Sequence, residues 1–118
     1  MDDPRIAGVV QMLNETEVRT TQSCEGHLSH GFPFPWVRIV KEDRFTLERL
    51  LMAFYEEHSM VYDRLLMIER LLDDEYMLRP HGGVLQEARD HDSQVACLKM
   101  YQQEMQAFEA FLRRFINE

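Results

Sequence analysis

The stretch "TTQSCEGHLSHGFPFPWV", Thr20 to Val37, predicts a strand, a loop and a second strand. It holds one of the two cysteines, two of the five histidines and the single tryptophan. β-Branched residues are frequent from Glu17 to Cys24, and the apolar run from Trp36 to Val40 resembles a second strand. Between them a loop is favoured by the residues that bend or stiffen the backbone: Gly26, Gly31, Pro33 and Pro35. We therefore expect two antiparallel strands, with the loop over one end of the sheet.

The sequence on either side of this unit predicts two amphipathic helices. Upstream, Asp3 is a suitable N-cap, and Pro4 suits the first helical position because its missing N–H has no partner there. Apolar residues then recur along one helix face and predict a helix over residues 3–14: Ile6, Val9, Val10 and Leu13. Downstream, an apolar stripe predicts a second helix from Thr46 to His58: Leu47, Leu50, Leu51 and Phe54.

Residues 60–72 and the segment after them fit two different structures. They can form two short strands around an acidic turn at Asp73-Asp74, ended by Pro80-His81-Gly82-Gly83. They can also form a helix with apolar residues on one face: Val61, Leu65, Ile68 and Leu72. We favour the hairpin, because paired aspartates suit a turn and the proline-glycine cluster ends regular structure.

The C-terminal region predicts a long helix that starts after a cap at Ser93 and runs almost to the end of the chain. Its apolar residues recur at alternating spacings of three and four: Leu98, Tyr101, Met105, Phe108, Leu112 and Phe115. We expect this helix to lie across the sheet, which gives the order α-β-β-α-β-β-α. Residues 1–118 are therefore predicted to form a single α+β domain with a mostly antiparallel sheet.

Composition and charge narrow the classes of partner. Thirteen basic and twenty-one acidic residues give a net charge of −8, which repels phosphate backbones and makes nucleic-acid binding unfavourable. No apolar run approaches the ~20 residues that cross a bilayer, and the acidic start "MDDPRI" lacks the pattern of a targeting peptide. We therefore expect a cytoplasmic protein with no membrane partner, in which Cys24 and Cys97 are reduced thiols.

One spacing in the loop resembles half of a structural zinc site, Cys-x2-His-x2-His: Cys24, His27 and His30. A closed zinc site needs four ligands, and distant candidates for the fourth are His81 and His91. Three protein ligands and a water would instead make a catalytic zinc centre with Glu25 as its base. Two further readings of Cys24 remain: a nucleophile with His27 as its base, or a small buried side chain.

The same loop could hold an anion. The backbone N–H groups of a tight turn over Ser23, Glu25 and Gly26 can bind a carboxylate or a phosphate. Arg38 and Arg79 suit the other side of such an anion, because guanidinium forks match both groups, although they could equally pair with surface acids. The first functional hypothesis is therefore a ligand-binding site built on these residues: Ser23, Cys24, Glu25, Gly26, His27, Arg38 and Arg79.

A second hypothesis treats the loop Ser23–His30 as a structural corner and the chain as an interaction module. Part of the apolar seam of the C-terminal helix, with Phe111 and Phe115, exceeds what one core needs. An unpartnered apolar helix face is typical of a contact between subunits. This hypothesis predicts a homodimer, or binding of another partner, through the C-terminal helix.

Part of the N-terminal sequence resembles a family signature, through Leu13-Asn14, Thr20-Thr21, Ser23-Cys24 and Gly26. These residues are similar to the "LN…TTSSCSGR" pattern of the wybutosine-synthesising protein 3 family, which methylates a modified guanosine in tRNA with S-adenosylmethionine. The resemblance covers about the first thirty residues, and Glu25 and His27 depart from the pattern. It implies a relative of a tRNA-modifying methyltransferase, with Ser23, Cys24 and Gly26 at a substrate or cofactor site.

Overall fold

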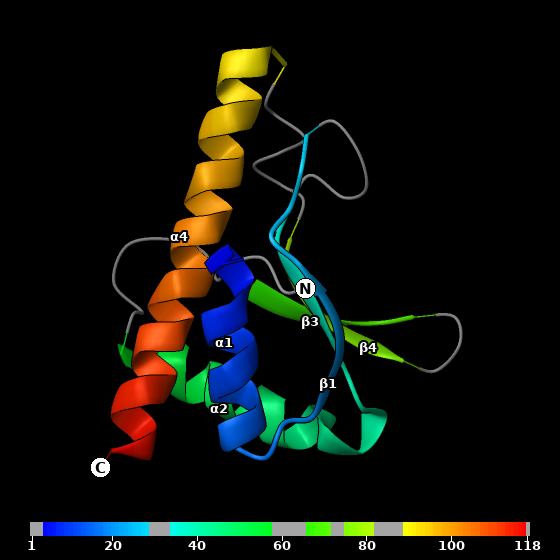
Figure 1. The fold of residues 1–118 in the computed structure, drawn as a ribbon, viewed down its shortest axis with the longest axis vertical. Coiled ribbons are helices and arrows are strands. Elements are labelled where there is room, and N and C mark those ends of the chain that lie inside the picture. The colour runs from blue at the N-terminus through cyan, green and yellow to red at the C-terminus, as the bar shows by residue number, and fades with distance from the viewer. Residues whose placement is uncertain (1–3, 29–33, 58–65, 72–74, 82–88, 118) are drawn as a thin grey trace.

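The elements follow one another in the predicted order in the structure, a computed structural model that describes residues 4–28, 34–57, 66–71, 75–81 and 89–117. Their bounds are α1 Pro4–Glu15, β1 Thr20–Cys24, β2 Trp36–Ile39, η1 Lys41–Asp43, α2 Arg44–Glu57, β3 Leu66–Arg70, β4 Tyr76–Pro80 and α4 His91–Ile116. The described strands form one antiparallel sheet in the order β1-β2-β4-β3 (Figure 1). This arrangement confirms the predicted single-domain α+β class.

Strands β1 and β2 pair across the loop as the sequence predicts. Cys24, the last residue of β1, lies opposite Trp36, the first residue of β2. The register shifts between Thr20 and Gln22, where β1 has a local irregularity. The ends of both strands that adjoin the loop therefore lie at the same end of the sheet.

Strands β3 and β4 form the favoured hairpin, so the helical alternative is wrong for residues 66–70. The period of two along β3 accounts for this: Leu66 is buried, Met67 is exposed and Ile68 packs against the core again. Leu78 of β4 lies opposite Ile68 and is fully buried. The acidic turn expected at Asp73-Asp74 lies outside the described residues.

The described helices pack on one face of the sheet and share one main core with it (Figure 1). Strand residues face this core from β2, β3 and β4: Val37, Ile39, Leu66 and Leu78. The predicted stripes of α1 and α2 also lie in it, with Phe54 of α2 completely buried. The other face of the sheet carries the alternate residues of each strand, including Trp36 and Arg38.

The first half of α4 extends past the strands and builds a second, smaller core near the loop (Figure 1). Cys97 and Tyr101 of α4 are buried there against Phe34, and Trp36 packs on the edge of the cluster. Burial raises the pKa of the Cys97 thiol, which therefore stays protonated. The second core joins α4 to the loop end of the sheet.

The N-terminal cap of α4 differs from the prediction. Asp90 is the cap, and its Oδ1 accepts a hydrogen bond of 2.7 Å from the backbone N–H of Ser93. Ser93 was predicted as the cap itself and is instead inside the first turn, because a carboxylate three residues earlier satisfies its free N–H. Asp3, the cap predicted for α1, lies outside the described residues.

The apolar seam of α4 is confirmed over most of its length. Tyr101, Met105, Phe108 and Leu112 are buried, whereas Phe115 at the end of the helix is 50% exposed. Within the described residues, none of the helices combines the length and apolar character needed to cross a membrane. Because Phe115 is exposed, the last turn of α4 leaves apolar surface that the core does not cover.

Candidate functional site

The loop that follows β1 turns sharply at Gly26. This glycine has φ of +92°, a conformation that residues with a side chain rarely adopt. A Cβ atom at this position would lie 2.6 Å from the carbonyl carbon of Phe34 and 2.9 Å from Cδ1 of Leu98. The glycine is therefore required both by the turn and by the close approach of the returning chain and α4.

Helix α4 holds the backbone of this turn through a side chain that the sequence did not suggest. Gln102 is buried, and its Nε2 donates a hydrogen bond of 3.0 Å to the carbonyl oxygen of Glu25. One residue earlier, the hydroxyl of Tyr101 donates to the carbonyl oxygen of His81 at 2.8 Å, just after β4. A single turn of α4 thus fixes two of the segments that meet at this end of the sheet.

The predicted loop residues lie together around the turn. Cys24 is half-buried, and its Sγ accepts a hydrogen bond of 3.5 Å from the N–H of Gly26. Glu25 and His27 are also half-buried, and Glu25 Oε1 lies 4.0 Å from His27 Nε2. Three of the proposed site residues, Cys24, Glu25 and His27, are therefore close neighbours with partly accessible side chains.

The metal prediction stays a prediction. His30, the third proposed zinc ligand, lies outside the described residues. Within the described part of the chain, no three His, Cys, Asp or Glu side chains are grouped so that they could hold a metal ion. A zinc site would therefore depend on where His30 lies relative to Cys24 and His27.

One donor of the predicted anion site is engaged within the protein, and one predicted site residue lies before the turn. The N–H of Gly26 points to Cys24 Sγ, and Ser23 lies inside strand β1, opposite Val37, before the turn begins. Ser23 is half-buried there. A nest for an anion at this turn would therefore rest on backbone groups other than the N–H of Gly26.

The two predicted arginines lie in different places, and each has a carboxylate partner. Arg79 Nη1 lies 3.3 Å from Glu69 Oε2, and its guanidinium lies 4.1 Å from the ring centroid of Phe34, which adjoins Gly26. Arg38 Nη1 lies 3.2 Å from Glu75 Oε2, while Arg38 Nε is buried without a hydrogen-bond partner among the described residues. The structure thus brings Arg79 towards the loop through Phe34, while Arg38 lies further along β2.

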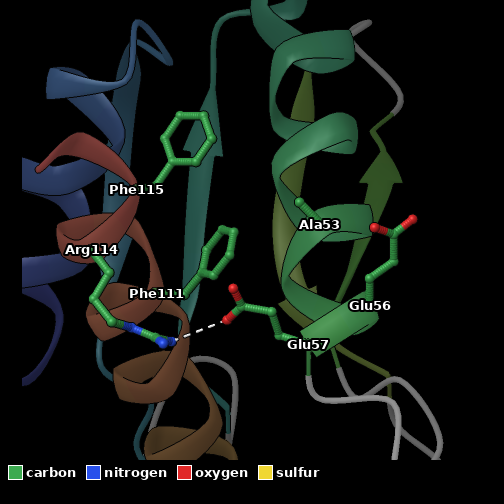
Figure 2. A pocket seen from close by; sticks show the side chains of 6 residues that line it. All are labelled: Ala53, Glu56, Glu57, Phe111, Arg114 and Phe115. Atoms are coloured by element: carbon green, nitrogen blue, oxygen red, sulfur yellow. Dashed lines mark hydrogen bonds and ion pairs between the residues drawn. The ribbon is translucent and has the colours of Figure 1, made fainter. Parts of the chain in front are cut away.

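A second candidate site lies at the opposite end of α4, between its last turns and the end of α2. We call this pocket of about 350 Å³ the terminal hollow (Figure 2), and it is lined by Ala53, Glu56, Glu57, Phe111, Arg114 and Phe115. Arg114 Nη2 lies 3.2 Å from Glu57 Oε2, which links the two helices across the hollow. Phe111 is buried and packs against the ring of Phe54 in the core, whereas Phe115 is half-exposed at the rim of the hollow.

The sequence identified one wall of the terminal hollow and missed the other. Phe115 fits the prediction of surplus apolar surface, but that prediction is wrong for Phe111, which is buried in the main core. No sequence pattern singles out Ala53, Glu56 and Glu57 of α2. The sequence shows only a small residue next to an apolar stripe, followed by two adjacent acids. This pattern is too common in helices to indicate a site. Only the packing of α2 against α4 shows that these residues face Phe111.

No protein-family model, curated protein or solved structure matches this chain. The resemblance to the wybutosine-synthesising protein 3 family therefore stays a prediction, resting on the residues that carry it.

Proposed function

We propose that this chain is a protein-interaction module that docks partners through the terminal hollow. The observation that supports this proposal best is Phe115, half-exposed beside the buried ring of Phe111. The next residue, Ile116, is 39% exposed, so the last turn of α4 presents two large apolar side chains to the solvent. An uncovered patch of this kind is typical of a surface that becomes buried in a complex.

The composition of the hollow supports a protein partner. Aromatic and arginine side chains contribute most strongly to protein interfaces, and Phe111, Arg114 and Phe115 line this pocket together. Fully burying a phenylalanine in an apolar environment contributes about 1.5–3 kcal/mol, so covering the exposed half of Phe115 would contribute roughly 1 kcal/mol. The homodimer predicted from the C-terminal helix is one form of this function.

Photo-crosslinking tests this proposal. With p-benzoylphenylalanine in place of Phe115 and irradiation of intact cells, we expect discrete adducts between this chain and a protein partner, because the reactive ring would lie inside the interface. The yield should fall severalfold when Ala53→Gln is added, since a longer side chain from α2 narrows the hollow. The adducts are resolved by gel electrophoresis and mass spectrometry.

The matched control places the same crosslinker at Met67, an apolar residue of β3 that is 38% exposed and outside the hollow. Adducts that appear equally from positions 115 and 67 would indicate random collisions and contradict the proposal. An absence of adducts from position 115 would contradict it as well.

A second candidate function is ligand binding at the loop, favoured by the contact between Glu25 and His27 next to Cys24 at an accessible sheet end. If these side chains and His30 hold a metal, the purified protein is expected to retain about one zinc ion per chain. Elemental analysis by mass spectrometry measures this, and Cys24→Ser should remove the zinc because it removes a thiolate ligand. Protein that contains no zinc and takes up none on titration would leave the loop without a metal function.

A further inference from the structure

We infer that the occupant of the terminal hollow is a second copy of this chain, docked about a two-fold axis, an inference that rests on the proposed interaction function. Two-fold contacts use the same patch on both copies, so the patch must fit itself in shape and in charge. The terminal hollow and the last turn of α4 meet both conditions.

The shape suits a two-fold contact because the exposed apolar side chains of the last turn lie next to the hollow. Phe115 and Ile116 are exposed on the last turn of α4, and the rings of Phe111 and Phe115 lie between α4 and α2 (Figure 2). In a two-fold contact, the exposed side chains of each copy would cover the hollow of the other copy. Both sets of apolar surface would then be buried in one step.

The charge is self-complementary because the two helices end with opposite charges. Helix α4 carries Arg113 and Arg114 in its last turn, whereas α2 ends in Glu56 and Glu57 and has no basic residue there. Carboxylates at a helix C-terminus face the negative end of the helix dipole, so α2 gains stability from a cation placed near its end. Arg114 supplies one such cation to Glu57 within the same copy.

Glu56 is the group that a second copy would satisfy. It lines the hollow and is exposed, and none of the ion pairs between described side chains involves it. Arg114 is 60% exposed, and a guanidinium has five N–H donors, so it can hold Glu57 of its own copy and Glu56 of the other. A basic segment of another protein would pair with Glu56 but would be repelled by Arg113 and Arg114. A second copy instead offers an arginine to Glu56 and a carboxylate to Arg114.

A charge exchange between copies tests the inference. The variants Glu56→Arg and Arg114→Glu should each dimerise at least about tenfold more weakly than the wild type, because each places like charges across the two-fold axis. An equimolar mixture should recover near wild-type association. In the mixed dimer, the unchanged Arg114 of one variant faces the unchanged Glu56 of the other. At the second contact both positions carry exchanged charges, so both ion pairs are attractive. Sedimentation equilibrium on the full chain measures all of these constants.

Two further variants complete the experiment. Glu48→Arg changes the same charge two turns earlier on α2, outside the hollow, and should leave dimerisation unchanged. Glu56→Gln removes the charge with the smallest structural change and should weaken the dimer even if Glu56→Arg folds poorly. Circular dichroism and unfolding midpoints confirm that each variant is folded.

The outcomes separate this inference from the proposed function. If the equimolar mixture does not recover association, the two-fold arrangement is overturned. It is overturned as well if Phe115→Ser leaves the dimerisation constant unchanged. If the wild-type chain stays monomeric at high concentration, a second copy is not the occupant of the terminal hollow. Discrete adducts with a different protein from position 115 would in that case still support the interaction function.

Discussion

Replacing Phe54 with alanine is expected to lower the free energy of unfolding by about 3–5 kcal/mol. Phe54 is completely buried, and its ring centroid lies 5.2 Å from that of Phe108 and 5.6 Å from that of Phe111. The substitution removes the aromatic contact through which α2 packs on α4 and leaves a cavity that rigid neighbours fill only in part. Since domains of this size are stable by only about 5–15 kcal/mol, the loss is a large share of the total.

The matched control is Phe45→Ala on the same helix. Phe45 is 57% exposed, and the guanidinium of Arg44 lies 4.5 Å from its ring centroid. An exposed cation–π contact contributes about 0.5–1 kcal/mol, so this variant should remain within about 1 kcal/mol of the wild type. Urea unfolding followed by circular dichroism measures both variants, and equal losses would show that burial of Phe54 does not organise the core.

Replacing Gly26 with alanine is expected to lower the free energy of unfolding by about 3 kcal/mol. The backbone at this turn has φ of +92°, and a methyl group would approach the backbone of Phe34 and the side chain of Leu98 too closely. Because Phe34 belongs to the second core, the strain should reach Trp36, the only tryptophan. Denaturant unfolding followed by tryptophan fluorescence therefore reports both the lost stability and the local change.

Gly8→Ala is the matched control for the glycine prediction. Gly8 lies inside α1, where alanine is favoured over glycine by about 1 kcal/mol. The three heavy atoms nearest to a new methyl group all belong to the carboxylate end of Glu109. That end can move by giving up its exposed pair with Arg113. The variant should stay within about 1 kcal/mol of the wild type. If Gly26→Ala does not lower the free energy of unfolding, the turn and α4 can move apart at little cost in stability, which contradicts the prediction.

The fold was predictable because its signals are local. The i, i+3, i+4 spacing of the apolar residues in α1 and α2, and the alternation along β3, each depend on a few neighbouring residues. The cap of α4 was predicted wrongly for the same reason: Asp90 and Ser93 are both good caps, and only the path of the chain into the helix shows which one lies at its start. Element type was easier to predict than element ends.

The candidate sites were only partly predictable. The loop prediction named Cys24, Glu25 and His27, which do lie together, because they are close in sequence as well. It could not find Gln102, which holds the turn from 77 residues away, or the carboxylates that pair with Arg38 and Arg79. Partners that distant in sequence leave no periodic signal in a single chain.

The sequence by itself determined the α-β-β-α-β-β-α order, the antiparallel hairpins and the apolar seam of α4, since patterns of apolar residues encode which face of each element is buried. The tertiary structure alone decided what remains uncovered after that burial. Phe111 and Phe115 lie about one turn apart on α4, yet the first is buried against Phe54 of α2 and the second is left half-exposed. Exposure at the end of a helix depends on where its neighbours end, and that is a property of the packed chain.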